Sequence, residues 1–367
     1  MKKTLLTICL TWMCFSLSAQ KIIDLSGKWS FSIDRQDNGE KEKWFSHTLN
    51  DCINLPGSMP EKLKGDEVTA KTQWTGSLYD SSYYYNPYME KYRKEGNIKF
   101  PFFLTPDKHY VGAAWYQKEV NIPADWKGER ILLFLERPHI ETTVWVNGQK
   151  TGMQNSLCVP HQYDITRYVR PGKCTITIRV DNRIKEINVG PDSHSITDQT
   201  QGNWNGIVGR ICLQTTPKTY FDDIQIYPEP EQKLARVKVV IKGTGTAKVK
   251  LSAESFNTDK KHIVPAIQQE IKLNKGVTET EMVLPMGNDM LLWDEFHPAL
   301  YKLKAEVTNG KKTEIKEIQF GMRRFEIKGK WFYVNGRKTQ LRGTVENCDF
   351  PLTGYAPMDV ESWERVF

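Results

Sequence analysis

The sequence has no long hydrophobic segment after its first twenty residues. The apolar run from Leu5 to Leu17 follows Lys2 and Lys3 and ends in small residues, a pattern typical of a secretory signal. A bilayer-spanning helix needs about 20 apolar residues, so this run is too short to span a membrane. A lipid anchor at Cys14 is the less favoured alternative, because Met13 and not a small residue precedes this cysteine. We therefore expect residues 1–20 to be a signal peptide and the mature protein to be exported, periplasmic or extracellular, with no transmembrane anchor.

Cysteine is scarce, and its distribution argues against a disulfide scaffold or a zinc-bound fold. The chain has 7 Cys, of which Cys9 and Cys14 lie in the expected signal peptide. The other five are far apart and odd in number, a pattern that leaves open one incidental disulfide; they are Cys52, Cys158, Cys174, Cys212 and Cys348. The histidines also lack the spacing of metal ligands. Apolar burial must therefore stabilise the fold.

Several motifs that define large enzyme classes are missing. The chain contains no Gly-x-Ser-x-Gly, no P-loop and no GxGxxG between a strand and a helix, which argues against serine hydrolases, nucleotide triphosphatases and dinucleotide-binding enzymes. The formal net charge is +7, but the basic residues form no stripe. Nucleic-acid binding therefore has no support.

The composition is that of an ordered chain with real cores. Of the 367 residues 39% are hydrophobic and 11% aromatic, and this length suggests two or three domains. The many Trp and Tyr rings fit core packing, and they equally suit surfaces that stack on sugar rings.

Residues 21–218 read as short strands joined by turns. Trp29, Phe31 and Ile33 alternate along a half-buried strand, and Asn147–Gly148 is a strong hairpin signal. Many such strands without helical periodicity predict a β-sandwich of jelly-roll type. The aromatic, irregular segment at about 74–107 is expected to be a surface insertion.

Residues 219–322 predict a second β domain. The segments 235–241, 247–253 and 279–284 alternate between apolar and polar residues, as do the strands of a small immunoglobulin-like (Ig-like) sandwich.

The last segment, residues 323–367, has a different pattern. Short strands around Trp331 are separated by a turn at Asn335–Gly336, and residues 341–344 are expected to form a buried strand. A polar loop follows, and a helix is predicted after Met358 with Asp359 as its N-cap. This order predicts one strand–loop–helix unit.

Five stretches in the first domain resemble, in order and spacing, the sugar-binding domain of family 2 glycoside hydrolases: GAAWYQKEV, LFLERPHIETTVWVNGQ, HQYDIT, TIRVDNR and NWNGIVGRICL. These enzymes are the retaining β-galactosidases, β-glucuronidases and β-mannosidases. The segment from VNGRKTQLRGT through FPLTGY resembles their barrel entrance. A (β/α)₈ barrel takes about 250 residues, so the resemblance implies that 323–367 is only the first βα unit of a truncated barrel.

The resemblance also implies which residues contact substrate. Retaining hydrolysis requires two carboxylates, which the resemblance places beyond Phe367, so no catalytic residue is expected in this chain. We expect substrate contacts, or alternatively structural hydrogen bonds, from two loops, which contain Asp198, Asn203 and Trp204, and Glu346, Asn347 and Asp349. For Trp204 a core position is favoured. In β-galactosidases of the family a histidine occupies the position of Asn347, so strict galactose specificity is in question.

The sequence thus predicts an exported glycoside hydrolase that releases terminal β-linked sugars from oligosaccharides with retention, β-galactosidase-like by default. The alternative is a non-catalytic carbohydrate-binding fragment. No cofactor is expected, although the resemblance leaves open a divalent or sodium ion in the full-length enzyme. Oligomerisation also stays open.

Overall fold

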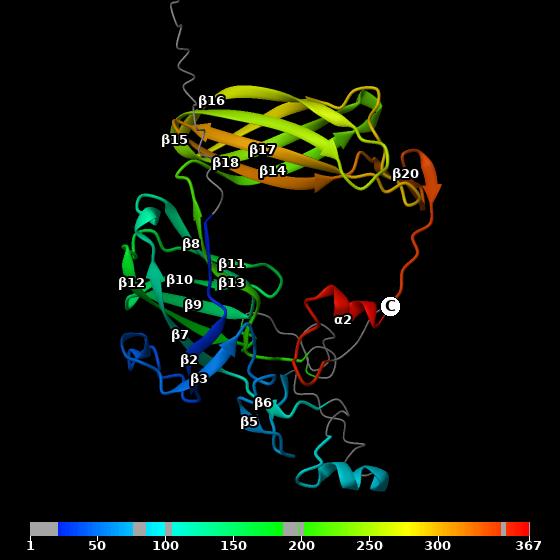
Figure 1. Cartoon of the computed structure of the whole chain (residues 1–367). Coiled ribbons are helices and arrows are strands. Elements are labelled where there is room, and N and C mark those ends of the chain that lie inside the picture. Colours follow the sequence, from blue (N-terminus) through cyan, green and yellow to red (C-terminus); the bar gives the residue numbers. More distant parts are fainter. Residues whose placement is uncertain are drawn as a thin grey trace, which may run out of the picture. The chain divides into compact units, whose positions relative to one another are not determined.

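The computed structural model describes residues 21–75, 86–99, 105–185, 198, 202–345 and 350–366. They divide into two compact units, 21–215 with 344–366 and 216–343 (Figure 1). The expected signal peptide, much of the 74–107 insertion and the residues Glu346, Asn347 and Asp349 lie outside the described residues. Within the described part, no helix is long and apolar enough to cross a membrane.

The first unit is built on two antiparallel sheets. One contains, in spatial order, β1 (Ile22–Asp24), β13 (Gly206–Thr216), β8 (Arg130–His139) and β11 (His161–Asp164), with β4 (Gly57–Ser58) paired to β13. The other contains β10 (Gln149–Asn155), β9 (Glu141–Val146), β12 (Gly172–Asp181), β7 (Ala113–Ile122), β2 (Gly27–Asp34) and β3 (Asp51–Leu55). The connections carry a two-stranded ribbon and short 3₁₀ turns, namely β5 (Asp66–Glu67), β6 (Lys108–His109), η1 (Trp44–Ser46), η3 (Pro87–Arg93) and η4 (Ala124–Trp126).

One apolar core joins these two sheets. It takes Leu133 and Leu135 from β8 and Ile176 and Ile178 from β12, all fully buried. Burying such a side chain stabilises the fold by about 1.5–3 kcal/mol. Trp29 of β2 is also buried, and its indole N–H donates to the Leu25 carbonyl at 2.9 Å, so its polar atom is satisfied. The predicted mainly β fold with a sandwich in this region is confirmed.

The second unit is one folded sheet of unusually long strands. The spatial order is β14 (Tyr220–Glu229), β15 (Leu234–Ser255), β17 (Tyr301–Asn309) and β18 (Lys312–Phe320), with β16 (Ile263–Pro285) also paired to β15; a 3₁₀ turn, η5 (Pro230–Gln232), precedes β15. The first half of β15 pairs with β14 and the second half with β17. The hairpin of β15 and β16 therefore runs through both layers of this sandwich, in agreement with the predicted second β domain.

A small three-stranded sheet follows in the second unit, made of β19 (Phe325–Lys328), β20 (Trp331–Val334) and β21 (Arg337–Thr339). The prediction of a buried strand at 341–344 is wrong, because Leu341 is 60% exposed and the segment is irregular. A buried barrel strand needs parallel neighbours, and none of the described segments pairs with it.

The predicted helix after Met358 is confirmed. Helix α2 (Val360–Glu364) begins after Asp359, whose carboxylate accepts a hydrogen bond from the Ser362 backbone N–H at 2.8 Å. This contact satisfies one of the free N–H groups at the start of the helix. The described residues thus contain the helix of the expected βα unit without its strand.

Candidate functional site

A C-terminal segment, residues 350–358, packs against the first sandwich. Tyr355 donates a hydrogen bond to Glu61 at 2.8 Å, and the Ser58 hydroxyl donates to the Thr353 carbonyl. Gly354 has φ +79°, and a Cβ there would lie 2.7 Å from the Cβ of Trp204. Only glycine permits this close approach without strain. These two hydrogen bonds and the close approach of Gly354 to Trp204 therefore hold the segment against the sandwich.

A pocket of about 700 Å³ lies where this segment meets the sandwich. It is lined by the end of β8, residues 157–160 before β11, the loop before β13 and the C-terminal segment. Its polar and aromatic lining side chains include Glu136, Arg137, His139, Asn203, Trp204 and Tyr355. The pocket mixes aromatic rings with a few polar groups, which is the usual composition of a small-molecule site.

Trp204 and His139 form the inner wall of this pocket. Their rings stack with centroids 4.6 Å apart, and the Nδ1–H of His139 donates to the Trp204 carbonyl at 2.7 Å. Burial lowers the pKa of His139 to about 4, so the imidazole is neutral at physiological pH. Trp204 is only 3% exposed and also contacts the ring of Tyr355. The indole thus lines the pocket mainly as a packing group, which agrees with the core position favoured from the sequence.

Asp198 and Asn203 lie next to each other beside the pocket, and their hydrogen bonds hold the loop before β13 in place. The Asp198 carboxylate accepts from the backbone N–H groups of Thr75 at 2.5 Å and Asn203 at 3.0 Å. The Asn203 amide donates to Thr75 Oγ1 at 2.7 Å and to the Asn182 carbonyl at 3.2 Å. Both side chains are about 95% buried, since their exposures are 5% and 6%. These contacts correspond to the structural alternative considered from the sequence; Asn203 also lines the pocket.

Asn203 and His109 both line a cavity of about 20 Å³, which is large enough for one water molecule. The Nε2 atom of His109 lies 3.6 Å from Asp198 Oδ1 and is buried. It has no hydrogen-bond partner among the described residues, and the same is true of Asn203 Oδ1. A hydroxyl or water oxygen placed here can satisfy both atoms.

An ionic cluster anchors the loop that leads from β12 toward Asp198. Asp181 is fully buried and accepts from Arg179 at 3.0 Å, from Lys185 at 2.8 Å and from Arg183. Glu141 adds a second carboxylate, 2.8 Å from Lys185. Burial opposes ionisation of Asp181, but the hydrogen bonds from Arg183 and Lys185 outweigh it and hold the pKa well below its usual range. The cluster therefore stays charged and fixes the start of the loop.

Glu136 is the only carboxylate that lines the pocket among the described residues. It accepts from the backbone N–H of Arg210 at 2.7 Å, and this bond holds its pKa below the ordinary value. Retaining glycoside hydrolysis needs two carboxylates about 5–5.5 Å apart. The described lining of the pocket therefore lacks the carboxylate pair that such a reaction requires. Nor do the described residues contain a cluster of three or more His, Cys, Asp or Glu that could hold a metal ion.

The structure thus brings together Asp198, Asn203 and Trp204. The sequence reasoning did not identify His139 and Tyr355 as members of the same site. Both lie in stretches that carry the family resemblance, but nothing in their local pattern indicates that β8 and residue 355 meet. The three loop residues Glu346, Asn347 and Asp349 remain predictions.

Comparisons with known proteins agree with this architecture. The family model described as "Glycosyl hydrolases family 2, sugar binding domain" matches residues 22–217, and "Glycosyl hydrolases family 2" matches residues 219–323. A β-glucuronidase from Paenibacillus borealis is 24% identical over 91% of this chain and 51% of its own length. A β-galactosidase from Thermoanaerobacter pseudethanolicus is 25% identical over 72% of this chain and 35% of its own length.

The solved structure of a β-glucuronidase from Ruminococcus gnavus is similar in fold, with a TM-score of 0.61 at 19% identity over 89% of this chain and 49% of that one. The chain therefore spans about half the length or less of the relatives it matches.

Proposed function

Because this chain belongs to family 2 of the glycosyl hydrolases, we propose that the complete protein is an exported enzyme that hydrolyses terminal β-linked sugars with retention of configuration. The observation that carries this proposal is the match of two family models along nearly all of residues 22–323. The catalytic carboxylates then belong to sequence that follows Phe367. The apolar segment at residues 1–20 supports export.

The sugar is proposed at the level of a class. Relatives bear the names β-glucuronidase and β-galactosidase, and the pocket on the first sandwich presents Arg137 and His139 beside Trp204. A β-galactoside remains the first substrate to test, and a β-glucuronide is the second because of those relatives. In the complete enzyme as proposed, the first unit contributes polar and aromatic contacts to the terminal sugar. The catalytic carboxylates after Phe367 cleave the glycosidic bond.

A second function applies to the chain as it stands, namely carbohydrate binding without cleavage. The observation that favours it is that Glu136 is the only described carboxylate lining the pocket. One carboxylate cannot supply both the nucleophile and the acid/base of a retaining reaction.

A panel of p-nitrophenyl β-glycosides tests both functions. The protein extended by the sequence that follows Phe367 in its gene is compared with residues 21–367 alone, using β-galactoside, β-glucuronide and β-mannoside. We expect the extended protein to hydrolyse at least one of the three and the shorter chain to hydrolyse none. A stop codon after Phe367, or an extended protein inactive on all three, contradicts the enzyme proposal. Turnover by the shorter chain contradicts the placement of the carboxylates.

A further inference from the structure

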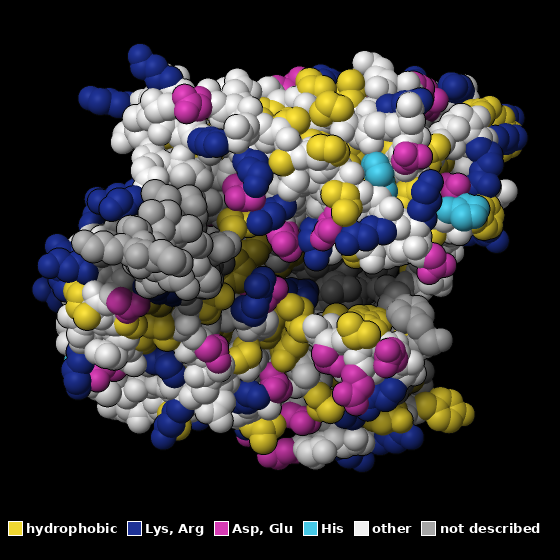
Figure 2. Space-filling model, turned by 45° about the horizontal axis from the view of Figure 1, so that its top comes forward, with side chains coloured by type: hydrophobic (Ala, Val, Ile, Leu, Met, Phe, Trp, Pro, Cys, Tyr) yellow, Lys and Arg dark blue, Asp and Glu magenta, His cyan; other side chains and the backbone are white. Residues whose placement is uncertain are grey.

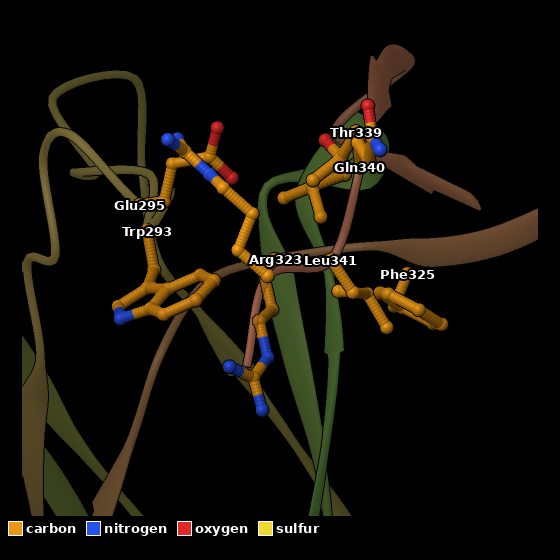
Figure 3. A pocket seen from close by; sticks show the side chains of 9 residues that line it. Trp293, Glu295, Arg323, Phe325, Thr339, Gln340 and Leu341 are labelled. Carbon is orange, nitrogen blue, oxygen red and sulfur yellow. The ribbon is translucent and has the colours of Figure 1, made fainter. Parts of the chain in front are cut away.

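Acidic and basic side chains are intermingled over much of the face seen in Figure 2, which is the pattern of a solvated surface. A pocket of about 460 Å³ lies beside the small sheet of β19–β21 in the second unit, and its lining includes Trp293, Arg323 and Phe325 (Figure 3). Residues 339–342 also line it, and under the proposed function they belong to the start of the catalytic barrel. The first unit contains a feature that bears directly on its own pocket.

A turn of the first unit, residues 57–64, supports both walls of the pocket proposed to receive the sugar, called here the candidate sugar pocket. The turn begins with β4, just after β3. One wall of the pocket carries Trp204 and the other carries Tyr355. The turn itself contributes nothing to the described lining. Its effect on the pocket is therefore indirect.

Backbone contacts join the turn to the wall that carries Trp204. The Met59 N–H donates to the Asn205 carbonyl at 2.7 Å, and Ser58 pairs with Gly206 in the antiparallel ladder of β4 and β13. Ser58 and Met59 are both fully buried. Because Asn205 follows Trp204 directly, the turn fixes the backbone position from which the indole extends.

Side-chain contacts join the same turn to the wall that carries Tyr355. Glu61 Oε2 accepts from the Tyr355 hydroxyl at 2.8 Å and from the Ser58 backbone N–H at 3.3 Å. The Ser58 hydroxyl accepts from the Glu61 backbone N–H at 3.2 Å and donates to the Thr353 carbonyl. The two reciprocal bonds between Ser58 and Glu61 have the pattern of a capping box, which the spacing Ser-x-x-Glu favours. The pair therefore forms one unit that binds the C-terminal segment at two points.

Two neighbours hold the Glu61 carboxylate within the turn. Lys62 donates to its other oxygen, Oε1. Burial opposes ionisation of Glu61, but the hydrogen bonds from Lys62 and Tyr355 outweigh it and hold the pKa of this carboxyl below its ordinary value. A Cβ at Gly57 would lie 2.9 Å from Glu61 Oε2, so glycine leaves the space into which the carboxylate folds back. The turn thus places the acceptor for Tyr355 by contacts of its own.

From this shared support we propose that Glu61 and Ser58 are positioning residues of the candidate sugar pocket, which hold Tyr355 and Trp204 at the spacing that admits the terminal sugar. The inference rests on the proposed function, because it takes this pocket as the place of the sugar. It adds that sugar binding depends on the geometry of the turn and not on the charge of Glu61. An amide at this position should therefore replace the carboxylate.

Calorimetric titration of residues 21–367 with methyl β-D-galactoside and with methyl β-D-glucuronide measures this dependence. Glu61→Leu removes the acceptor for the Tyr355 hydroxyl and for the Ser58 N–H, and it should weaken binding of the preferred glycoside at least tenfold. Glu61→Gln keeps an acceptor oxygen in the turn and should recover the affinity to within about threefold.

A matched control and a second variant accompany this series. Glu40→Leu is the control, because Glu40 pairs with Lys150 at the surface of the same unit; it should change binding less than twofold. Ser58→Ala removes the hydrogen bond to the Thr353 carbonyl and should weaken binding about fivefold. It tests the same proposal if Glu61→Leu fails to fold.

Hydrogen exchange separates positioning from a general loss of stability. In Glu61→Leu the amides of residues 202–205 and 350–358 should both exchange at least fivefold faster, since one turn supports both walls. Amides of β7 and β12 should keep their rates. In Glu61→Gln the two walls should exchange within about twofold of the unsubstituted chain.

Glycoside binding that is unchanged in Glu61→Leu overturns the proposal. Equal loss in Glu61→Gln also overturns it, because charge and not geometry would then be required, and so does absence of binding of both glycosides by the unsubstituted chain. The proposed hydrolysis fails separately, through an extended protein that cleaves none of the p-nitrophenyl glycosides, because calorimetry measures binding without cleavage.

Discussion

The hydroxyl of Tyr355 donates a hydrogen bond of 2.8 Å to the carboxylate of Glu61, a residue 294 positions earlier in the chain. Burial and the nearby Glu61 raise the pKa of Tyr355 above its usual value, so the phenol remains a donor at all physiological pH values. This bond and the close fit of Gly354 against Trp204 secure the C-terminal segment that forms one wall of the candidate sugar pocket.

The first prediction concerns this attachment. Tyr355→Phe removes the hydrogen bond to Glu61 and should weaken the docking of residues 350–358 by about 1–2 kcal/mol. Hydrogen exchange of amides in this segment should accelerate roughly tenfold, while exchange in β7 and β12 stays unchanged. Tyr88→Phe is the control, because Tyr88 is 82% exposed. Equal exchange in the two variants would show that the segment is held by other contacts.

The second prediction is a pH dependence that depends on His139. The folded protein keeps this imidazole neutral down to about pH 4, whereas the unfolded chain binds a proton near pH 6.5. The unfolded state therefore carries more protons between these values, and the free energy of unfolding falls as the pH is lowered from 6.5 to 4. The loss attributable to His139 is up to about 3 kcal/mol.

Urea unfolding of the first unit at several pH values measures this effect. His139→Gln should flatten the dependence between pH 6.5 and 4 relative to the unsubstituted chain. The same substitution at the exposed His47 should leave the slope unchanged. A slope that persists in His139→Gln would contradict this assignment and would mean that other groups set acid stability in that window, such as the buried His161, whose pKa is also lowered by burial.

The third prediction concerns the ionic cluster at the end of β12. Asp181→Asn removes a buried carboxylate that accepts from Arg179, Arg183 and Lys185. It leaves Arg179, only 8% exposed, with less compensation, and we expect a loss of about 3–5 kcal/mol. Asp125→Asn breaks an exposed pair with Lys21 that solvent screens, so it should leave the free energy of unfolding almost unchanged. The denaturant midpoints of the two variants measure these losses of stability. Similar midpoints would show that the buried cluster stabilises the fold no more than a surface ion pair does.

Much of the fold was predictable because the alternation of apolar and polar residues identifies the strands and turn dipeptides identify their ends. Trp29 and Phe31 alternate inward along β2 as expected, and the family resemblance, which the two family models confirm, predicted both β domains. Long strands were less predictable. The segments 235–241 and 247–253 were expected as separate strands, but they form one strand, β15, that continues through a β-bulge near Gly245. A bulge and a turn both use glycine at positive φ, so the local pattern does not separate them.

The expected strand at 341–344 failed for a different reason. An apolar segment forms a buried strand only when neighbouring strands provide hydrogen-bond partners on both sides. No described segment provides such partners for residues 341–344. Leu341 instead lines the pocket of the second unit. The helix after Met358 was predictable because its cap, Asp359, and the amide that it binds lie three residues apart.

The candidate site was predictable only in part. Loop composition and resemblance pointed to Asp198, Asn203 and Trp204, which the structure does bring together. Tyr355 and His139 join them through contacts between residues far apart in sequence, and local patterns contain no signal for such contacts. The short-range signals also could not show that both oxygens of Asp198 are committed to backbone amides.

The most direct test of the central claim is covalent trapping of the glycosyl-enzyme intermediate. The gene product extended beyond Phe367 is incubated with 2-deoxy-2-fluoro-β-D-galactosyl and β-D-glucuronyl fluorides, and the labelled peptide is located by mass spectrometry. We predict a mass increase of one fluoroglycosyl group on a glutamate that lies after Phe367, and no label on residues 21–367 alone. A label on a carboxylate within residues 21–367, or an extended protein that hydrolyses β-glycosides with inversion and is never labelled, would contradict the account.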